Sequence, residues 1–214
     1  MVVTSMDASF AKEAGLKSQC GFLSMFTDKR VLEDPAPCSI VEFQSATIPR
    51  VVGSTMAAES ASLSTTVDRH LYLRLVTECI LYGEPNYGDD WRHKLKVPGV
   101  ITTDAKSLFD HISTTGSVPK HRQTLIDLLA ARDLVENKTV TMRWVPTTHM
   151  LADVLTKCMT PNEVTQRLLL DGAYSLVPTP EEEEEEEHRK ALRQGQRQRA
   201  KDKKKARTDS NTSQ

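Results

Sequence analysis

Four acidic residues, spread along most of the chain, are the residues whose positions suggest chemistry. Asp7 and Asp104 each follow a short apolar run that is typical of a strand. Glu59 and Asp153 lie in the first turns of segments with helical patterns. In open α/β sheets, ligands bind at the carboxyl ends of the strands, so these positions favour one shared site.

A site made of four acids points to divalent cations, because converging carboxylates repel each other and bound cations relieve that repulsion. Two cations about 3.5–4 Å apart activate a water molecule and stabilise the leaving oxygen of an in-line phosphoryl displacement. Mg²⁺ prefers carboxylate oxygens, and we expect two Mg²⁺ ions here, with Mn²⁺ as a substitute. The sequence shows no convincing Ser-His-Asp or Cys-His set, which agrees with a reaction that needs no side-chain nucleophile.

Each acid also has a simpler structural explanation. Asp104, followed by Ala-Lys-Ser, would suit the N-cap of the next helix. Glu59 would suit the solvent-exposed face of its helix, and Asp153 would suit the positive end of a helix dipole. For a single Asp after a strand such a role is more common than metal binding, so the shared site depends on the joint placement of all four.

The elements that must position these acids are predicted from hydrophobic periodicity. Five strands are predicted, at Val2–Met6, Gln19–Phe26, Ile40–Ser45, Val100–Thr103 and Thr139–Val145. Four helices are predicted, at residues 55–82 with Ser54 or Thr55 as N-cap, Ala105–Ile112, residues 120–136, and Met150–Leu170 with a break near Thr160–Pro161. This order indicates an α/β fold with a five-stranded mixed sheet and helices on both faces.

The C-terminal part of the 214-residue chain differs sharply in composition from the rest. We predict a domain over residues 1–176 and a low-complexity, disordered or helical tail over residues 177–214. Seven glutamates, Glu181–Glu187, precede a stretch of ten Lys and Arg residues against one acid at 188–207. The basic block is expected to bind nucleic acid without sequence preference and also resembles a nuclear localisation cluster. The alternative is a tail that only solubilises the protein.

The cysteines and the apolar runs indicate an intracellular protein. Cys20, Cys38, Cys79 and Cys158 show no Cys-x-x-Cys spacing, which favours reduced structural thiols in the cytoplasm or nucleus. The N-terminal residues lack the layout of a signal peptide. No apolar run approaches the roughly 20 residues of a membrane helix, so we expect no membrane partner.

Five segments, in this order along the chain, resemble one known family. They are Thr4–Ala11, Ser18–Leu23, Ser54–Glu59, Thr103–Leu108 and Trp144–Lys157. Together they resemble the ribonuclease H domain at the end of copia-type retrotransposon Pol polyproteins. The most specific pieces are Ser-Thr-x-x-Ala-Glu and the Trp-Val-Pro segment that continues into Leu-Ala-Asp and Leu-Thr-Lys. The resemblance covers most of the chain before the tail.

The resemblance implies a ribonuclease H-like fold and a hydrolase that cuts the RNA strand of RNA/DNA hybrids by two-metal phosphodiester cleavage. Asp7, Glu59, Asp104 and Asp153 would be its catalytic, metal-binding acids. It also implies the reverse transcriptase of the same element as a partner. Two other classes stay open: a catalytically inactive ribonuclease H-like module that binds nucleic acid or a partner, and a structural or regulatory protein that works through its charged tail.

The same resemblance implies contacts to the hybrid near the acids, where the 2′-hydroxyl of the RNA strand must be recognised. Small polar residues, Ser9, Thr55 and Ser107, are the candidates for substrate binding. His149 lies four residues before Asp153 and is either a helper in product release or an incidental histidine of the first helical turn.

Overall fold

The computed structural model describes residues 1–13, 17–83, 88–114, 122–157 and 163–177, together with Glu184, Glu187 and Ala191. The chain divides into two compact units, Met1–Val177 and Pro178–Gln214. The predicted form of the tail lies almost wholly outside the described residues. The fold and the site belong to the first unit.

A six-stranded mixed sheet with the order β5-β4-β1-β2-β3-β6 forms the centre of this unit. Its strands are β1 (Val2–Glu13), β2 (Lys17–Thr27), β3 (Ala36–Thr47), β4 (Gly99–Thr103), β5 (Thr141–Trp144) and β6 (Ala173–Tyr174). The first three strands pair antiparallel, whereas β4 and β5 run parallel to β1. The predicted mixed sheet is confirmed. The sixth strand, β6, is two residues long and too short to leave a periodic pattern in the sequence.

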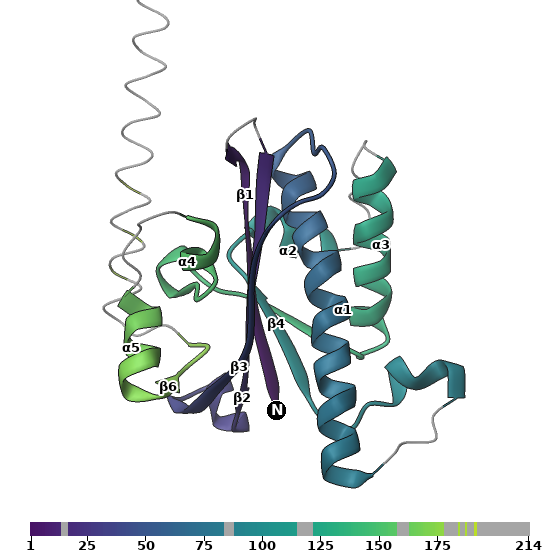
Figure 1. Cartoon of the computed structure of the whole chain (residues 1–214), viewed down its shortest axis with the longest axis vertical. Helices are drawn as coiled ribbons and strands as arrows, with labels where there is room; N and C mark the ends of the chain where they lie inside the picture. The colour runs from purple at the N-terminus through teal and green to yellow at the C-terminus, as the bar shows by residue number, and fades with distance from the viewer. Residues whose placement is uncertain are drawn as a thin grey trace, which may run out of the picture. The chain divides into compact units, whose positions relative to one another are not determined.

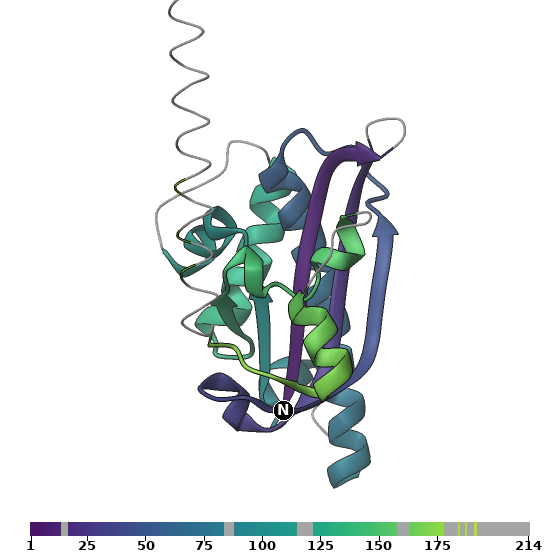
Figure 2. The same ribbon diagram turned by 90° about the vertical axis from the view of Figure 1, so that its left-hand side faces the viewer.

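Helices cover both faces of the sheet, as predicted (Figure 1). The helices α1 (Thr55–Tyr82), α2 (Lys106–Ser113) and α3 (Arg122–Glu136) lie on one face, and α4 (Asp153–Thr156) and α5 (Glu163–Asp171) lie on the other. In Figure 2 the last two stand in front of the sheet. Short 3-10 turns occur at η1 (Lys29–Leu32), η2 (Gly88–Lys94) and η3 (Thr147–His149).

Two of the composition-based expectations concern features that the structure describes. Cys20, Cys38 and Cys79 are free thiols, and Cys158 lies outside the described residues. Among the helices described, none combines the length and the apolar character needed to cross a bilayer.

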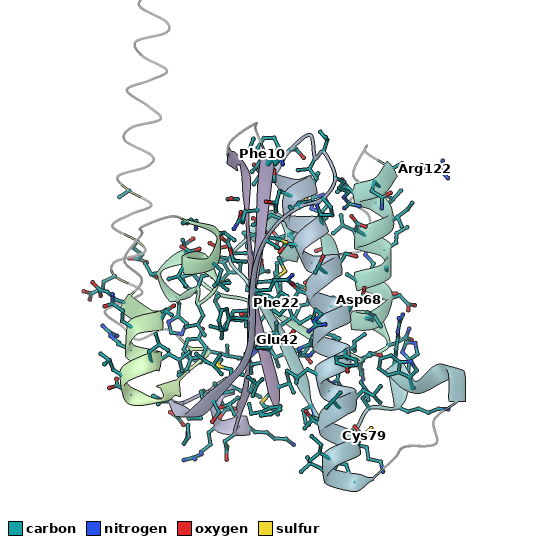
Figure 3. All side chains as sticks on the ribbon, in the orientation of Figure 1. Phe10, Phe22, Glu42, Asp68, Cys79 and Arg122 are labelled. Atoms are coloured by element: carbon teal, nitrogen blue, oxygen red, sulfur yellow. The ribbon has the colours of Figure 1, made fainter. Side chains whose placement is uncertain are left out.

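Alternate side chains of β1 face two separate apolar cores, which fill the layers seen in Figure 3. Met6 belongs to the core on the side of α1, together with Phe22 and Leu63. Val3 belongs to the core on the side of α5, together with Leu168. Because side chains alternate along a strand, the odd-numbered residues after Val3 also point toward the face that carries α4 and α5.

The long helix α1 begins where its capping residue predicts. The Ser54 side chain accepts a hydrogen bond of 3.1 Å from the Ala57 N–H, which confirms the predicted N-cap. The helix ends at Gly83, whose φ of 82° suits glycine. This start places Glu59 just beyond the first turn of α1.

The first strand is longer than predicted, so Asp7 lies within β1 and not at its end. The ladder with β2 continues past Met6 through the pairs Asp7–Gly21 and Ser9–Gln19. Asp has a low strand propensity, but pairing with a neighbouring strand overrides a local preference of that size.

The predicted helix Met150–Leu170 is confirmed in part, and its first residues are not helical. The 3-10 turn η3 is followed by three consecutive residues, Met150, Leu151 and Ala152, that are all completely buried. A surface helix buries one face, so a run of three buried residues does not suit it. The described residues of the predicted span form two separate helices, the four-residue α4 and the later α5. Residues 158–162, between these helices, lie outside the description.

Candidate metal centre

The register of β1 and β4 places Asp7 beside Asp104. These strands run parallel, and Ser5 pairs with Thr102. Asp7 and Asp104 each lie two residues further along the chain, so they reach the same level and the same face of the sheet. The predicted convergence of these two acids therefore follows directly from strand pairing, although only Asp104 lies at the carboxyl end of its strand.

Gly21 allows α4 to bring a third acid to this place. Gly21 pairs with Asp7 across β1 and β2, and a Cβ atom at Gly21 would lie 2.7 Å from the Leu155 Cβ. A larger residue would therefore push α4 away from the sheet. With α4 in contact, one carboxylate oxygen each of Asp7, Asp104 and Asp153 lies within 4.8 Å of the other two.

Neighbouring hydroxyl and indole groups orient two of these acids. The Thr147 hydroxyl donates a hydrogen bond of 2.8 Å to Oδ2 of Asp104. The Trp144 indole N–H donates to the backbone carbonyl of Asp104 at 3.0 Å. On the other side, the Thr156 hydroxyl donates to Oδ2 of Asp7. These donors come from the Trp144–Lys157 segment, but the sequence pattern predicted no role for them.

Lys157 is a further residue of the site, and it was not predicted from the sequence. Its Nζ lies 2.5 Å from Oδ1 of Asp153 and 3.9 Å from Oδ2 of Asp7. The side chain is only 25% exposed. The sequence signal that could have revealed Lys157 is its spacing of four residues from Asp153, because residues i and i+4 are neighbours on a helix.

Glu59 is buried at the same site but stands apart from the group of three. The residue is 6% exposed, so the explanation that it lies on the solvent-exposed face of α1 is wrong. Its Oε2 atom has no hydrogen-bond partner among the described residues. Burial raises the pKa of Glu59 well above its ordinary value, and the charges of Asp7 and Asp104 raise it further. We call these four acids, Asp7, Glu59, Asp104 and Asp153, the acidic site.

The carboxyl group of Asp7 has a perturbed protonation equilibrium. Burial is the main cause that raises its pKa to about 6, and the charges of Asp104 and Asp153 act in the same direction. The ammonium of Lys157 and the hydrogen bond from Thr156 oppose this rise but do not cancel it. A carboxyl group in these surroundings is stabilised by added positive charge.

The donor set fits a hard divalent cation. It consists of carboxylate oxygens, which Mg²⁺ and Mn²⁺ accept. Carboxylate oxygens on opposite sides of one Mg²⁺ ion are about 4.2 Å apart, so oxygens within 4.8 Å need to move only slightly. Two buried polar atoms at or beside the site, Oε2 of Glu59 and Oγ of Ser9, lack a hydrogen-bond partner within the described part of the chain. Such atoms in a protein interior suit a bound ion or water.

The remaining structural explanations do not account for Asp104 and Asp153. Helix α2 has Ala105 at its N-cap position and no side-chain cap hydrogen bond, so the alternative explanation, that Asp104 caps this helix, is wrong. Asp153 opens a helix of only four residues, whose dipole is small, and its carboxylate pairs with Lys157.

The residues predicted to contact substrate fall into three different environments. Ser9 is 2% exposed and follows Asp7 by two residues, on the same face of β1. Thr55 and Ser107 are exposed at the first turns of α1 and α2. His149 is 3% exposed, stacks on the Tyr174 ring at 4.9 Å, and has its Nε2 against the Ser175 carbonyl. His149 ends the 3-10 turn η3 and Asp153 begins α4, so the four-residue spacing does not put the two residues on one helix.

Comparison with known proteins gives structural likenesses alone. Neither a protein-family model nor a curated protein matches the sequence. The N-terminal ribonuclease H domain of a Mycobacterium tuberculosis protein is similar at 17% identity and a TM-score of 0.49, covering 79% of this chain and 96% of that one. Ribonuclease H1 from Halobacterium salinarum is similar at 15% identity and a TM-score of 0.48, covering 77% and 97%.

A third solved structure, LC11 ribonuclease H1 in complex with an RNA/DNA hybrid, is similar at 12% identity and a TM-score of 0.45, covering 79% of this chain and 99% of that one. With TM-scores below 0.5, these likenesses carry no conclusion about function, which depends on the residues of the acidic site.

Proposed function

We propose that this chain is a divalent-metal-dependent endonuclease that cleaves the RNA strand of RNA/DNA hybrids, a ribonuclease H derived from a copia-type retrotransposon. The observation that carries the proposal is the meeting of Asp7, Asp104 and Asp153 within 4.8 Å, with buried Glu59 beside them. The order of the five sequence segments supports the copia-type origin.

The acids of the site fit the metal chemistry of phosphodiester hydrolysis. Asp7, Asp104 and Asp153 would hold the cations, with Glu59 completing the set from α1. Bound Mg²⁺ or Mn²⁺ would supply an activated water and charge neutralisation at the phosphate. Water would attack the phosphorus and the P–O3′ bond would break, so the 3′-oxygen would leave as a hydroxyl and the phosphate would stay on the 5′ end.

The chain's own residues contribute orientation and a dry environment. Thr147 and Thr156 fix the rotamers of Asp104 and Asp7 through their hydroxyl donors. Asp7, Glu59 and Asp153 are each at most 7% exposed, so little water competes for their oxygens. Preorganised charges in such a site act more strongly than charges in water.

Recognition of the hybrid would use polar groups around the acidic site. Thr55 is the first residue of α1, the helix that carries Glu59, and Ser107 lies in the first turn of α2, which follows Asp104. Both residues are exposed and can contact a nucleic-acid backbone. Ser9 offers a hydroxyl next to Asp7. We leave His149 out of the substrate contacts because its Nε2 already lies against the Ser175 carbonyl and its ring stacks on Tyr174, whereas the Ser9 hydroxyl has no partner among the described residues. The reverse transcriptase of the same element is the proposed partner, in the cytoplasm or nucleus.

A cleavage assay with the purified full chain tests the proposal. The substrate is an RNA/DNA hybrid with labelled RNA, and single-stranded RNA, RNA duplex and DNA duplex serve as controls. We expect cleavage of the hybrid's RNA strand with Mg²⁺ or Mn²⁺, none with a chelator, and none with Asp104→Asn. Cleavage that persists in the chelator would contradict the metal-dependent mechanism.

The same assay separates the proposal from the inactive-module alternative. If the folded wild-type chain binds the hybrid but does not cleave it at any Mg²⁺ or Mn²⁺ concentration, the chain is a nucleic-acid-binding module. If it neither binds nor cleaves, the charged tail becomes the better candidate for the working part.

A further inference from the structure

Lys157 places a positive charge inside the acidic site. It follows α4 directly, and its backbone N–H donates to the Asp153 carbonyl at 2.9 Å. Its ammonium lies 2.5 Å from Oδ1 of Asp153 and 3.9 Å from Oδ2 of Asp7. Burial is the largest cause that raises the pKa values of Asp7 and Glu59, and the neighbouring acids raise them further. The Lys157 ammonium opposes this rise and lowers both pKa values.

The ammonium and a divalent cation would compete for the same carboxylates. Oδ1 of Asp153 contacts Lys157, and Asp153 belongs to the group of three acids that fits a metal. With a Mg–O distance of about 2.1 Å, an ion on that oxygen would lie within about 5 Å of Nζ in the present geometry. Two cations this close repel each other strongly in a buried site.

We propose that Lys157 is a resident counter-cation that holds Asp7 and Asp153 together before metal binds and withdraws when a divalent ion takes its place. This proposal rests on the metal site of the proposed function and adds how that site is regulated. Lys157 is a positioning residue that sets metal affinity: it stabilises the metal-free acids and so weakens metal binding. The lysine's flexible four-carbon stem allows the withdrawal.

The competing explanation is an ordinary helical ion pair that only stabilises α4. The chain contains a matched example, Lys106 and Asp110, which have the same four-residue spacing at 2.8 Å. Both of those side chains are more than half exposed, so that pair contributes little. Lys106→Met is therefore the control for Lys157→Met.

The experiment is a calorimetric titration of the metal-free full chain with Mn²⁺ and with Mg²⁺. We expect Lys157→Met to bind Mn²⁺ about tenfold more tightly than wild type, because it removes a repelling charge. Lys106→Met and Lys157→Arg should bind as wild type does. Thermal unfolding should show a lower metal-free midpoint for Lys157→Met and a larger rise on addition of Mn²⁺ than wild type shows.

Equal or weaker Mn²⁺ binding by Lys157→Met overturns the proposal and leaves Lys157 as a structural ion pair. If Lys157→Met does not fold without metal, Lys157→Gln replaces it. If that variant also fails to fold, recovery of the fold on addition of Mn²⁺ supports the proposal, and failure to recover contradicts it.

Hybrid cleavage measured on the same samples separates the two proposals. Active proteins with equal metal affinities would contradict the role of Lys157 and leave the nuclease function standing. Inactive proteins with a tighter-binding Lys157→Met would contradict the nuclease function and leave the role of Lys157 standing.

Discussion

The helix α1 carries buried ionisable residues at two places, and the two groups are built in opposite ways. Near its start, Glu59 joins the acidic site. Further along, His70, Arg74 and Glu78 are each at most 3% exposed; we call these three the α1 anchor. Both groups are buried, but the two charged side chains of the α1 anchor have opposite signs and are bound by backbone groups, and Nε2 of His70 is its one atom without a partner among the described residues.

The partners of the α1 anchor come from several elements. Arg74 donates to the Val97 carbonyl at 2.7 Å and to the Thr139 carbonyl, and Oε2 of Glu78 accepts from the Val97 N–H at 3.1 Å. The His70 Nδ1 lies 2.9 Å from the Thr4 hydroxyl. Gly99 makes this packing possible, since a Cβ atom there would overlap Nε2 of His70.

The comparison shows that burial of charge alone does not mark a functional site. The α1 anchor places an acid within electrostatic range of a base and ties both to the backbone, as a structural network should. The acidic site gathers four acids around one lysine, which costs stability in the absence of a ligand. An uncompensated excess of one charge in a buried site is what suggests metal binding.

The largest expected effect is the loss of activity on neutralising the acidic site. Asp7→Asn should lower the rate of hybrid cleavage by at least about a thousandfold, equivalent to about 4 kcal/mol in the barrier. It should leave metal-free stability equal or higher, because it removes a buried charge whose pKa is raised. Cleavage rates and urea unfolding measure both. An active Asp7→Asn, or one that loses several kcal/mol, would make Asp7 a structural residue.

The next largest effect is on stability and concerns the α1 anchor. Arg74→Met should destabilise the fold by about 3–5 kcal/mol, because it leaves the buried Val97 and Thr139 carbonyls without their donor and removes the positive charge near Glu78. Cleavage per folded molecule should not change. Urea unfolding gives the stability, and Arg74→Met combined with Glu78→Leu should recover part of the loss. Equal stability of Arg74→Met and wild type would show that the two regions do not differ as described.

The pH dependence of metal-free stability should have opposite signs in the two regions. The pKa of Asp7 is raised from 3.8 to about 6, so its stabilising contribution is present below about pH 3.8 and is lost as pH rises through 6. Burial, and then Arg74, lowers the pKa of His70 from 6.5 to about 3, so its contribution is present above pH 6.5 and is lost as pH falls toward 3.

The difference in the free energy of unfolding between wild type and Asp7→Asn isolates the pH dependence that Asp7 contributes. Between pH 4 and pH 7 the metal-free wild type should lose about 3 kcal/mol relative to Asp7→Asn, from a shift of about two pKa units. Unfolding at a series of pH values measures this difference. A constant difference across the range would mean that Asp7 ionises as an ordinary exposed acid.

The smallest expected effect concerns the tail, because both buried regions lie before residue 181. Deleting residues 181–214 should weaken hybrid binding and leave cleavage chemistry intact. The weakening should fade as salt rises, since each neutralised phosphate adds close to one unit to the slope of log K against log salt. Deleting only Glu181–Glu187 should tighten binding if these glutamates mask the basic block. Identical binding curves for all three proteins would exclude the tail from substrate capture.

Much of the site's framework could be predicted from short-range patterns. Alternating and helical periodicity located β2, β4 and α1, and Ser54 was one of the two residues, with Thr55, predicted as the cap of α1. Local patterns predicted the structure less well where strand pairing or tertiary packing determines the extent of an element. β1 runs past Asp7 because β2 continues beside it, and the segment before α4 is buried on all sides rather than on one face.

The sequence by itself determined which acids are present, that Asp104 follows a strand, and that an acidic and a basic block follow the domain. Only the tertiary structure decided that Lys157 lies between Asp7 and Asp153, that Glu59 is buried, and that His149 packs on Tyr174. The physical reason is the sequence separation over which each kind of interaction acts. Caps and periodicity act between residues a few positions apart, whereas Thr156 and Asp7, 149 positions apart, meet only because α4 packs over Gly21.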